Sequence, residues 1–155
     1  MGLKVACIKI KAEQTFATFA VALLTYIANE QAASENESKQ TIWSIVNHLI
    51  FWNVQWLERF NTEKFLINST FNNDETFYLE PDSINENRWK ETLERLQKVF
   101  SNWRKALEEC DESKFSTEIP AYFNAPWWGV VSNLCIHNAY HIGQIMLLKK
   151  QIRDK

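Results

Sequence analysis

The chain has 155 residues, of which 46% are hydrophobic and 23% are charged, a composition typical of a single globular domain of ordinary size. Its formal net charge of -2 lacks the basic excess that proteins use to bind nucleic acid. Three glycines and three prolines are too few for the many turns of a β-sandwich or barrel, or for a glycine-rich phosphate loop. The composition therefore favours one all-α domain over residues 1–155.

The first two helices are expected in the N-terminal third of the chain. Apolar residues recur at steps of three and four from Ile8 to Asn29, which predicts the first helix. Within it, Phe16 to Ala28 is preceded by lysines as in a signal peptide, but Glu13 interrupts the approach, and about thirteen residues are too few to span a membrane. We therefore expect a buried helix in a cytoplasmic protein without membrane contact. A second helix, apolar on all sides before Glu58, is expected from Gln40 to Asn61.

A long connection is expected between the second and third helices. The periodicity is lost from Thr62 to Pro81, where Asn and Asp gather, and short extended pieces are expected around Phe77 to Leu79. The third helix should begin near Ser83, because Ser83 and Glu86 have the spacing of a capping box. Its apolar seam then advances by steps of four and three up to Cys110.

The last part of the chain predicts a loop and a fourth helix. The loop is expected from Asp111 to Ala125, and the helix from Pro126 to Gln151, since proline is tolerated in a first helical turn. Four long helices with one long connection predict a four-helix bundle, whose sites are built from side chains that face its interior. One apolar stripe of the fourth helix could serve bundle packing or form a homodimer face. It consists of Cys135, Ala139, Ile142 and Met146.

All three histidines lie in the second and fourth helices, the two most apolar ones. His137 and His141 are four residues apart, so they diverge by only about 40° and share one helix face, where they could chelate an ion. His48 is the candidate third ligand, because zinc sites with an open position commonly use three protein ligands. Metal coordination would also remove the desolvation cost of three buried imidazoles. The alternative is that each histidine is a hydrogen-bonded core residue.

Several other side chains could take part in such a site. Gln55 and Gln144 share the histidine faces and could orient a metal-bound water or a substrate carbonyl, or simply close the mouth of the bundle. Arg59 could bind an anionic carboxylate of a thiol cofactor, or be a solvated charge at a helix end. Large aromatic residues could wall a pocket over the ion or belong to the core. They are Trp52, Tyr122, Phe123, Trp127 and Trp128.

Two segments carry a family resemblance. Residues 43–49 read W-S-I-V-N-H-L and residues 137–145 read H-N-A-Y-H-I-G-Q-I, and both are similar to motifs of the DinB/YfiT-like superfamily. The resemblance spans most of the chain and implies an up-down-down-up four-helix bundle with a long crossover between helices two and three. It also implies that His48, His137 and His141 bind nickel or zinc. Several relatives are metal-dependent transferases or isomerases that use bacillithiol, mycothiol or glutathione, and others are described only as metal-dependent hydrolases.

The preferred functional hypothesis is a metal-dependent thiol S-transferase that acts on a small-molecule substrate. The ion would activate a low-molecular-weight thiol such as bacillithiol, so that the protein need not supply its own nucleophile. Cys135 should point away from the metal, being two residues and thus about 160° from His137. Hydrolysis by metal-activated water is the alternative, although no Asp or Glu lies on the ligand faces within one turn of the histidines. A third hypothesis is a non-enzymatic metal-binding or dimeric interaction module.

Overall fold

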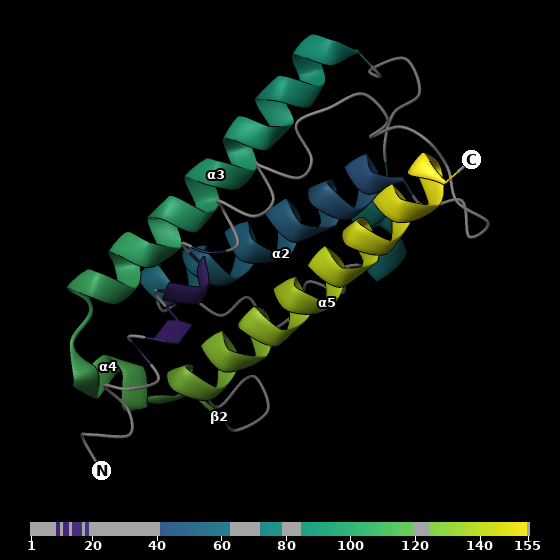
Figure 1. Ribbon diagram of the computed structural model, residues 1–155. Coiled ribbons are helices and arrows are strands. Elements are labelled where there is room, and N and C mark those ends of the chain that lie inside the picture. Colours follow the sequence, from purple (N-terminus) through teal and green to yellow (C-terminus); the bar gives the residue numbers. More distant parts are fainter. Residues whose placement is uncertain are drawn as a thin grey trace.

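Three long helices form most of the described structure, a computed structural model that describes residues 9, 11, 12, 14–16, 18, 41–62, 72–78, 85–119 and 125–154. They are α2 (Ile42–Thr62), α3 (Glu86–Glu109) and α5 (Trp127–Arg153) (Figure 1). The smaller elements are the 3-10 helix η1 (Asn73–Phe77), α4 (Glu112–Ser116) and the strands β1 (Glu118–Ile119) and β2 (Ala125–Pro126). The described residues between 9 and 18 are also helical, and the remainder of the first predicted helix, to Asn29, lies outside the described residues.

Helices α2 and α3 run parallel to each other. Near the start of both, Trp43 Nε1 donates to Thr92 Oγ1 at 3.2 Å, and further along both, Trp103 Nε1 donates to the carbonyl of Asn53 at 3.0 Å. A chain that runs through two parallel helices in succession must return along the bundle between them, which requires a long crossover. The connection between the end of α2 at Thr62 and the start of α3 at Glu86 is long enough for this return, and a long connection here is what the sequence predicted.

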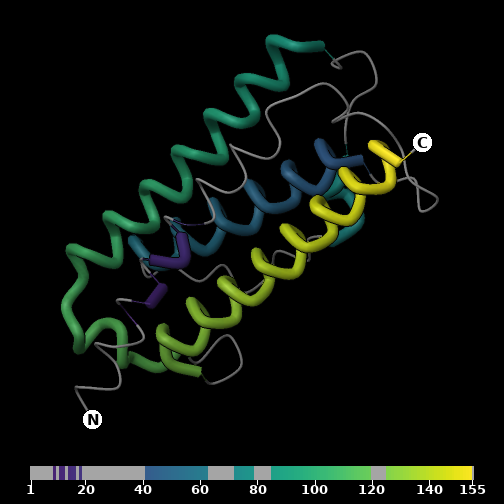
Figure 2. The backbone as a smooth tube through the Cα atoms, viewed as in Figure 1, coloured from purple at the N-terminus to yellow at the C-terminus, as the bar shows by residue number. Residues whose placement is uncertain are grey.

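The first helical segment and α5 run in the opposite direction. Lys9 Nζ donates to the carbonyl of Cys110 at 2.8 Å, while Phe16 stacks on Trp103 at 5.4 Å, so this segment is antiparallel to α3. Figure 2 shows α5 running against α2, and the contact between Phe60 and Trp127 at 5.0 Å joins the end of α2 to the start of α5. The all-α, up-down-down-up four-helix bundle predicted from the sequence is thereby confirmed.

Side-chain caps determine where the helices begin. Thr41 and Ser44 cap α2 reciprocally, each side-chain oxygen accepting from the other residue's amide, at 2.9 and 3.0 Å. The prediction that α3 begins near Ser83 was wrong, because the side chain of Asn85 accepts from the amide of Arg88 at 3.0 Å and the helix begins at Glu86. Helix α5 begins one residue after Pro126, whose backbone is extended, and continues to Arg153.

Two segments expected to be irregular or extended contain short elements. Residues 73–77 form the 3-10 helix η1 because the side chain of Asn72 accepts from the amide of Asp74 at 3.1 Å, so extended structure begins only at Tyr78. Asp111 starts α4 in the same way by accepting from the amide of Ser113 at 2.7 Å. Within the loop expected from 111 to 125, β1 and β2 pair antiparallel and lead the chain into α5.

Aromatic residues from all four helices form the centre of the core. Trp103 of α3 contacts Phe16 and also Phe60 of α2, the latter at 5.5 Å, and Phe60 contacts Trp127 of α5. All four side chains are almost completely buried. Because aromatic pairs add specific contact geometry to a large apolar area, this cluster sets how the helices pack at this end of the bundle.

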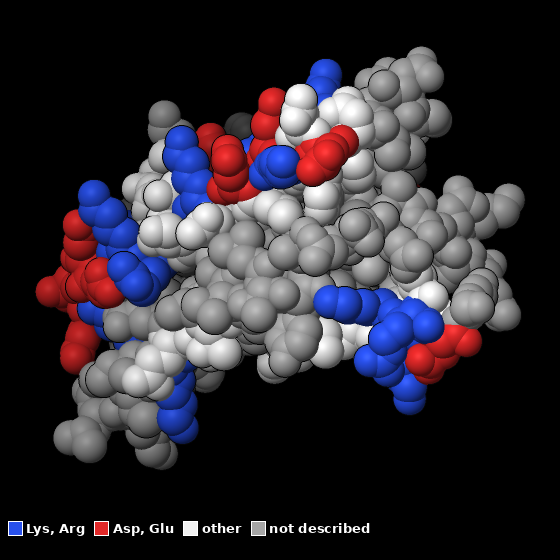
Figure 3. All heavy atoms as spheres, turned by 45° about the horizontal axis from the view of Figure 1, so that its top comes forward, with Lys and Arg blue, Asp and Glu red and all other residues white. Residues whose placement is uncertain are grey.

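The outer faces of the helices differ in chemistry. Acidic and basic side chains mix along α3, where Lys90 pairs with Glu86 at 3.2 Å and Arg104 with Glu108 at 3.4 Å (Figure 3).

On α5, Cys135 and Ile142 pack partly against the core, so half of the predicted apolar stripe serves bundle packing. The homodimer face stays a prediction. None of the helices in the described ranges is both long and apolar enough to cross a membrane.

A buried pair of amides joins α2 to α5. Asn53 Nδ2 donates to Asn138 Oδ1 at 2.8 Å, and Asn138 Nδ2 donates to Asn53 Oδ1 at 3.1 Å. Asn53 also donates to the carbonyl of Leu49 at 2.8 Å, and both side chains are 0% exposed. Since a buried amide must be satisfied, this pair fixes the register of the two helices.

Replacing one member of the amide pair should therefore cost more than replacing both. Asn53→Leu or Asn138→Leu leaves the other amide buried without its partner and should lower the free energy of unfolding by about 1–3 kcal/mol. The double variant should lose less than the sum of the single losses. Urea denaturation of the four proteins measures this coupling. Strictly additive losses would contradict the proposed register lock.

Candidate metal centre

Three imidazoles meet between α2 and α5. One ring nitrogen each of His48, His137 and His141 lies within 4.8 Å of the other two, and the Nε2 atoms of His48 and His137 are 3.0 Å apart. The ring of His141 lies 4.5 Å from that of His48 and 4.6 Å from that of His137. The structure thus brings together the three histidines that the sequence marks as candidate ligands.

Helix geometry explains why the rings converge. His137 and His141 are one turn apart on the face of α5 that packs against α2, and the antiparallel crossing places His48 opposite them. The amide pair of Asn53 and Asn138 lies next to the cluster, since Asn138 directly follows His137. The register that this pair fixes is therefore also the register that brings His48 to the other two histidines.

Thr76 of η1 sets the orientation of the His48 ring. Its hydroxyl donates to the carbonyl of Asn73 at 2.6 Å, so its oxygen is an acceptor for His48 Nδ1, 2.5 Å away. His48 must then carry its proton on Nδ1, and the Nε2 lone pair points at the other histidines. Such an outer contact is typical of metal-binding histidines, in which the non-ligating nitrogen donates to an oxygen.

Gln144 orients His141 in the same way. His141 Nδ1 donates to Gln144 Oε1 at 2.7 Å, while Gln144 Nε2 donates to the hydroxyl of Tyr140 at 3.1 Å. In this orientation the amide oxygen faces Nδ1 and can only accept, so the imidazole carries its proton on Nδ1. Nε2 of His141 is therefore left with its lone pair. Gln144 acts on the far side of the ring from the cluster, as an orienting residue.

His137 is the least constrained of the three rings. Its Nδ1 is buried and has no hydrogen-bond partner in the described part of the chain, so Nε2 can change between donor and acceptor by a shift of tautomer. A zinc ion 2.0–2.1 Å from each of three tetrahedral nitrogens would separate them by about 3.4 Å. The 3.0 Å between the nitrogens of His48 and His137 is close to that value, all three ligand atoms lie within 4.8 Å of one another, and two lone pairs already converge. The residues present therefore fit a divalent ion.

Burial keeps the cluster uncharged. Desolvation, followed by the charges of His141 and His137, lowers the pKa of His48 to about 3. The pKa values of His137 and His141 are also lowered, in both cases mainly by burial. His48 and His141 are only 2% and 6% exposed. At neutral pH all three imidazoles are thus neutral, which is the form that binds metal.

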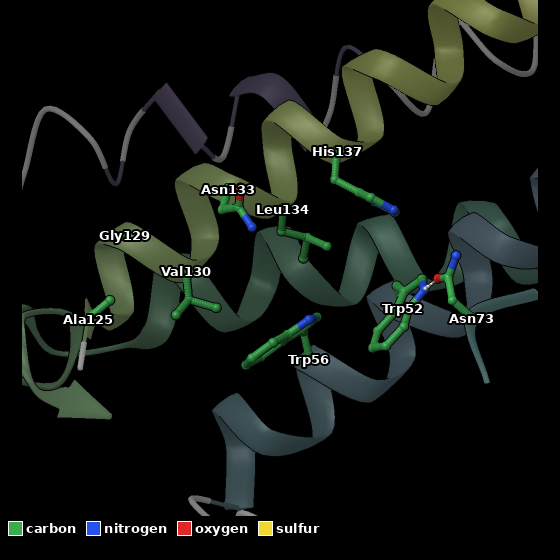
Figure 4. A pocket seen from close by; sticks show the side chains of 9 residues that line it. All are labelled: Trp52, Trp56, Asn73, Ala125, Gly129, Val130, Asn133, Leu134 and His137. Atoms are coloured by element: carbon green, nitrogen blue, oxygen red, sulfur yellow. Dashed lines mark hydrogen bonds between the residues drawn. The ribbon is translucent and has the colours of Figure 1, made fainter. Parts of the chain in front are cut away.

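An aromatic ring and a cavity flank the cluster. Phe77 of η1 stacks on His48 at 3.9 Å with an angle of 11° between the rings. On the other side, His137 forms one end of a cavity of about 510 Å³ between α2 and α5 (Figure 4). The cavity is lined by Trp52, Trp56, Asn73, Ala125, Gly129, Val130, Asn133, Leu134 and His137. A group bound there would lie beside the cluster.

The remaining predicted site residues are placed in different surroundings. Trp52 lines the cavity beside His137, but Gln55 lines another one, between α2, η1 and α3. Arg59 is buried and stacks 4.7 Å over Trp56, so it is not a solvated helix-end charge, and it does not line the cavity beside His137. Trp128 is 37% exposed and does not line it either. The aromatic candidates Tyr122 and Phe123 lie outside the described residues.

Two further sequence predictions concern Trp127 and Cys135. Trp127 belongs to the core. Cys135 lies outside the histidine cluster, and burial raises the pKa of its thiol to about 12, so it is a poor nucleophile. Sequence reasoning missed Thr76 and Phe77, which contact His48 from the crossover. Their segment has no periodicity, and no local signal marks it as part of a site.

The metal-free protein should lose stability as the pH falls. The unfolded chain binds a proton at each histidine near pH 6.5, whereas folded His48 does so only near pH 3, so protonation favours unfolding between these values. Urea midpoints in the presence of a chelator should fall steadily from pH 7 to pH 4. His48→Gln should show a shallower fall, because it lacks this titration. A wild-type midpoint that is constant over this range would contradict the buried, neutral cluster.

The chain resembles a solved structure, described as "YfiT from Bacillus subtilis is a probable metal-dependent hydrolase with an unusual four-helix bundle topology". The TM-score is 0.75 at 15% sequence identity, over 93% of this chain and 87% of that one, which shows a shared fold. No curated protein matches the sequence. The family model of the DinB superfamily matches residues 13–145, most of the chain, and the protein therefore belongs to the DinB superfamily.

Proposed function

We propose that His48, His137 and His141 hold a nickel or zinc ion and that the protein is a thiol S-transferase, which joins a low-molecular-weight thiol such as bacillithiol to an electrophile. The observation that carries the proposal is the convergence of three neutral ring nitrogens within 4.8 Å. When bound, a divalent ion lowers the pKa of a sulfur or water ligand, and three histidines leave a position open for it.

The residues around the cluster favour a thiol over water as the activated group. In the described ranges, hydrogen bonds and ring contacts reach the histidines from Trp52, Thr76, Phe77, Tyr140 and Gln144. None of them is a carboxylate, the usual acceptor for the proton of an attacking water. A free thiol, with an ordinary pKa of about 8.5, is far more acidic than free water and depends less on such an acceptor.

Each of these side chains has a separate task in the proposed site. Thr76 and Gln144 hold the ligand rings in place through Nδ1, so that their Nε2 atoms remain available. Phe77 covers His48 and keeps solvent from that side of the ring. The open side of His137 faces the cavity, where the electrophile would bind.

Hydrolysis is the second candidate function. It is favoured by the likeness to a fold described for a probable metal-dependent hydrolase. The same histidines would then hold the ion that binds the water, with solvent or a residue outside the described ranges as the proton acceptor.

We also propose that the protein acts in the cytoplasm, because Cys135 is a free thiol and a small-thiol substrate requires a reducing compartment.

Metal content tests the ligand set directly. Purified protein loaded with nickel or zinc and then desalted should retain about one ion per chain, because the three histidines form one site. His141→Ala should lower the metal affinity by at least about 100-fold, while Ser132→Ala, on an outer turn of the same helix, should bind as the wild type does. Elemental analysis measures the stoichiometry. Wild-type protein that retains no ion would overturn the proposal.

Turnover separates the two enzymatic candidates. Metal-loaded protein is incubated with 1-chloro-2,4-dinitrobenzene and bacillithiol or glutathione, and separately with 4-nitrophenyl acetate without thiol. We expect conjugate that requires both thiol and metal and that His141→Ala does not form. Metal-dependent ester cleavage without any conjugate would replace transfer by hydrolysis. If the protein binds metal but forms neither the conjugate nor the cleaved ester, it is a metal-binding module, and both enzymatic proposals are rejected.

Thr76 supplies a prediction about positioning. Thr76→Val keeps the shape of the side chain but removes the oxygen that accepts from His48 Nδ1, so the metal affinity should fall by about 10–100-fold. Thr76→Ser retains the hydroxyl and should restore most of the affinity. Competition with a chromogenic chelator measures the dissociation constants of both variants. Equal affinities for Val and Ser would contradict the assigned role of the hydroxyl.

A further inference from the structure

The cavity beside His137 is elongated along α5. Gly129 and His137 lie at opposite ends of its wall, eight residues apart, which corresponds to about 12 Å of helix. Figure 4 shows Gly129 and Ala125 together at one end, His137 at the other, and Trp52 and Trp56 facing the cavity from α2. The cavity is therefore a channel that leads away from the candidate metal centre.

The walls of the channel are apolar and aromatic. Trp52 and Trp56 are four residues apart, so their half-buried rings line one face of α2, and Asn73 fixes Trp52 by accepting from its Nε1 at 3.3 Å. Val130 and Leu134 form the facing wall on α5. None of the nine lining residues in the described part of the chain carries an Asp, Glu, Lys or Arg side chain. A charged group bound along these walls would lose its hydration without gaining an oppositely charged partner there.

Two small residues, Gly129 and Ala125, meet at the end of the channel far from His137. A Cβ atom on Gly129 would lie 3.6 Å from Ala125 Cβ and 3.9 Å from Pro126 Cδ, which are ordinary contact distances. Neither the packing nor the helical backbone of α5 therefore requires glycine at this position. The missing side chain leaves volume at the end of the channel.

We propose that this channel binds an uncharged, elongated apolar group of the electrophile, such as an aromatic or alkyl body. The reactive end of that substrate lies beside His137, and its apolar end lies between Gly129 and Ala125. The assignment of the reactive end rests on the proposed function. The binding of the apolar body depends only on the walls of the channel, so it can be measured without metal and without turnover.

Two probes that share one ring system test the chemistry of the walls. N-phenyl-1-naphthylamine is neutral, and 1-anilinonaphthalene-8-sulfonate adds one negative charge to the same rings. Fluorescence titration of the metal-free protein should show the neutral probe binding at least about tenfold more tightly, because the charged one must be desolvated. Equal or tighter binding of the sulfonate would overturn the proposal that the ligand is uncharged.

The position of the probe is tested by filling the far end. Gly129→Leu should weaken binding of the neutral probe by at least about tenfold, because the new side chain occupies the volume that the ligand uses. Gly143→Leu is the matched control on the same helix, since a Cβ there would meet nothing within 4 Å. Ala125→Leu obstructs the same end from β2 and replaces Gly129→Leu if that variant does not fold, as judged by circular dichroism. If Gly129→Leu or Ala125→Leu folds and still binds the neutral probe with wild-type affinity, the proposed location of the ligand is wrong.

The outcomes distinguish this proposal from the proposed function. Probe binding that Gly129→Leu weakens, together with a metal-loaded protein that conjugates no thiol, would reject thiol transfer and keep the apolar channel. Thiol conjugation by a protein whose channel binds no neutral probe would keep the function and reject the channel. In metal-loaded protein, Gly129→Leu should leave the metal stoichiometry unchanged, because Gly129 is two turns from His137.

Discussion

The contact between the Nε2 atoms of His48 and His137, 3.0 Å apart, is the constraint on which the site depends. Two nitrogen lone pairs at this distance repel each other unless a proton or a cation lies between them. Thr76 holds the proton of His48 on Nδ1, so His48 cannot supply the bridging proton. In the metal-free protein that proton must come from His137. A divalent ion in its place also removes the repulsion, because all three imidazoles can turn a lone pair towards it. In both states Nδ1 of His137 is buried without a partner among the described residues.

The topology of the bundle supplies the outer contacts of the cluster. Because α2 and α3 are parallel, the chain between them must pass along the bundle, and η1 forms where this crossover reaches His48. In one short element, Asn73 holds a tryptophan of the channel, Thr76 orients a ligand and Phe77 covers it. In a bundle with a short loop at this point, no backbone would pass there. The unusual helix order is thus a structural requirement of the site as well as of the fold.

Much of the fold and the ligand set could be predicted from the sequence, because both follow from helical periodicity. The spacing of His137 and His141 fixes their common face, and the apolar character of both helices places His48 inside. The contributions of η1 could not be predicted, because they depend on where an aperiodic segment of the crossover lies in space. The same limit applies to Gln55 and Trp128, which share helices with site residues but point into other surroundings. Helical spacing gives the face of a residue, and only packing decides what that face meets.

On our proposals, the residues that carry the reaction are mostly different from those that select the substrate. Reactivity, on our proposal, resides in three imidazoles whose protons are placed by Thr76 and Gln144, and these groups make no contact that depends on the body of a substrate. Recognition depends instead on the channel, whose length is set by Gly129 and Ala125 and whose width is set by the tryptophans of α2. Gly129 and Val130 lie on other turns of α5 than His137 and His141, so these wall residues can change without removing a contact of the cluster, whereas Trp52 and His137 belong to both. Membership of the DinB superfamily therefore places the chain in a family, whereas its proposed metal and substrate are inferred from the histidines and the channel of this chain.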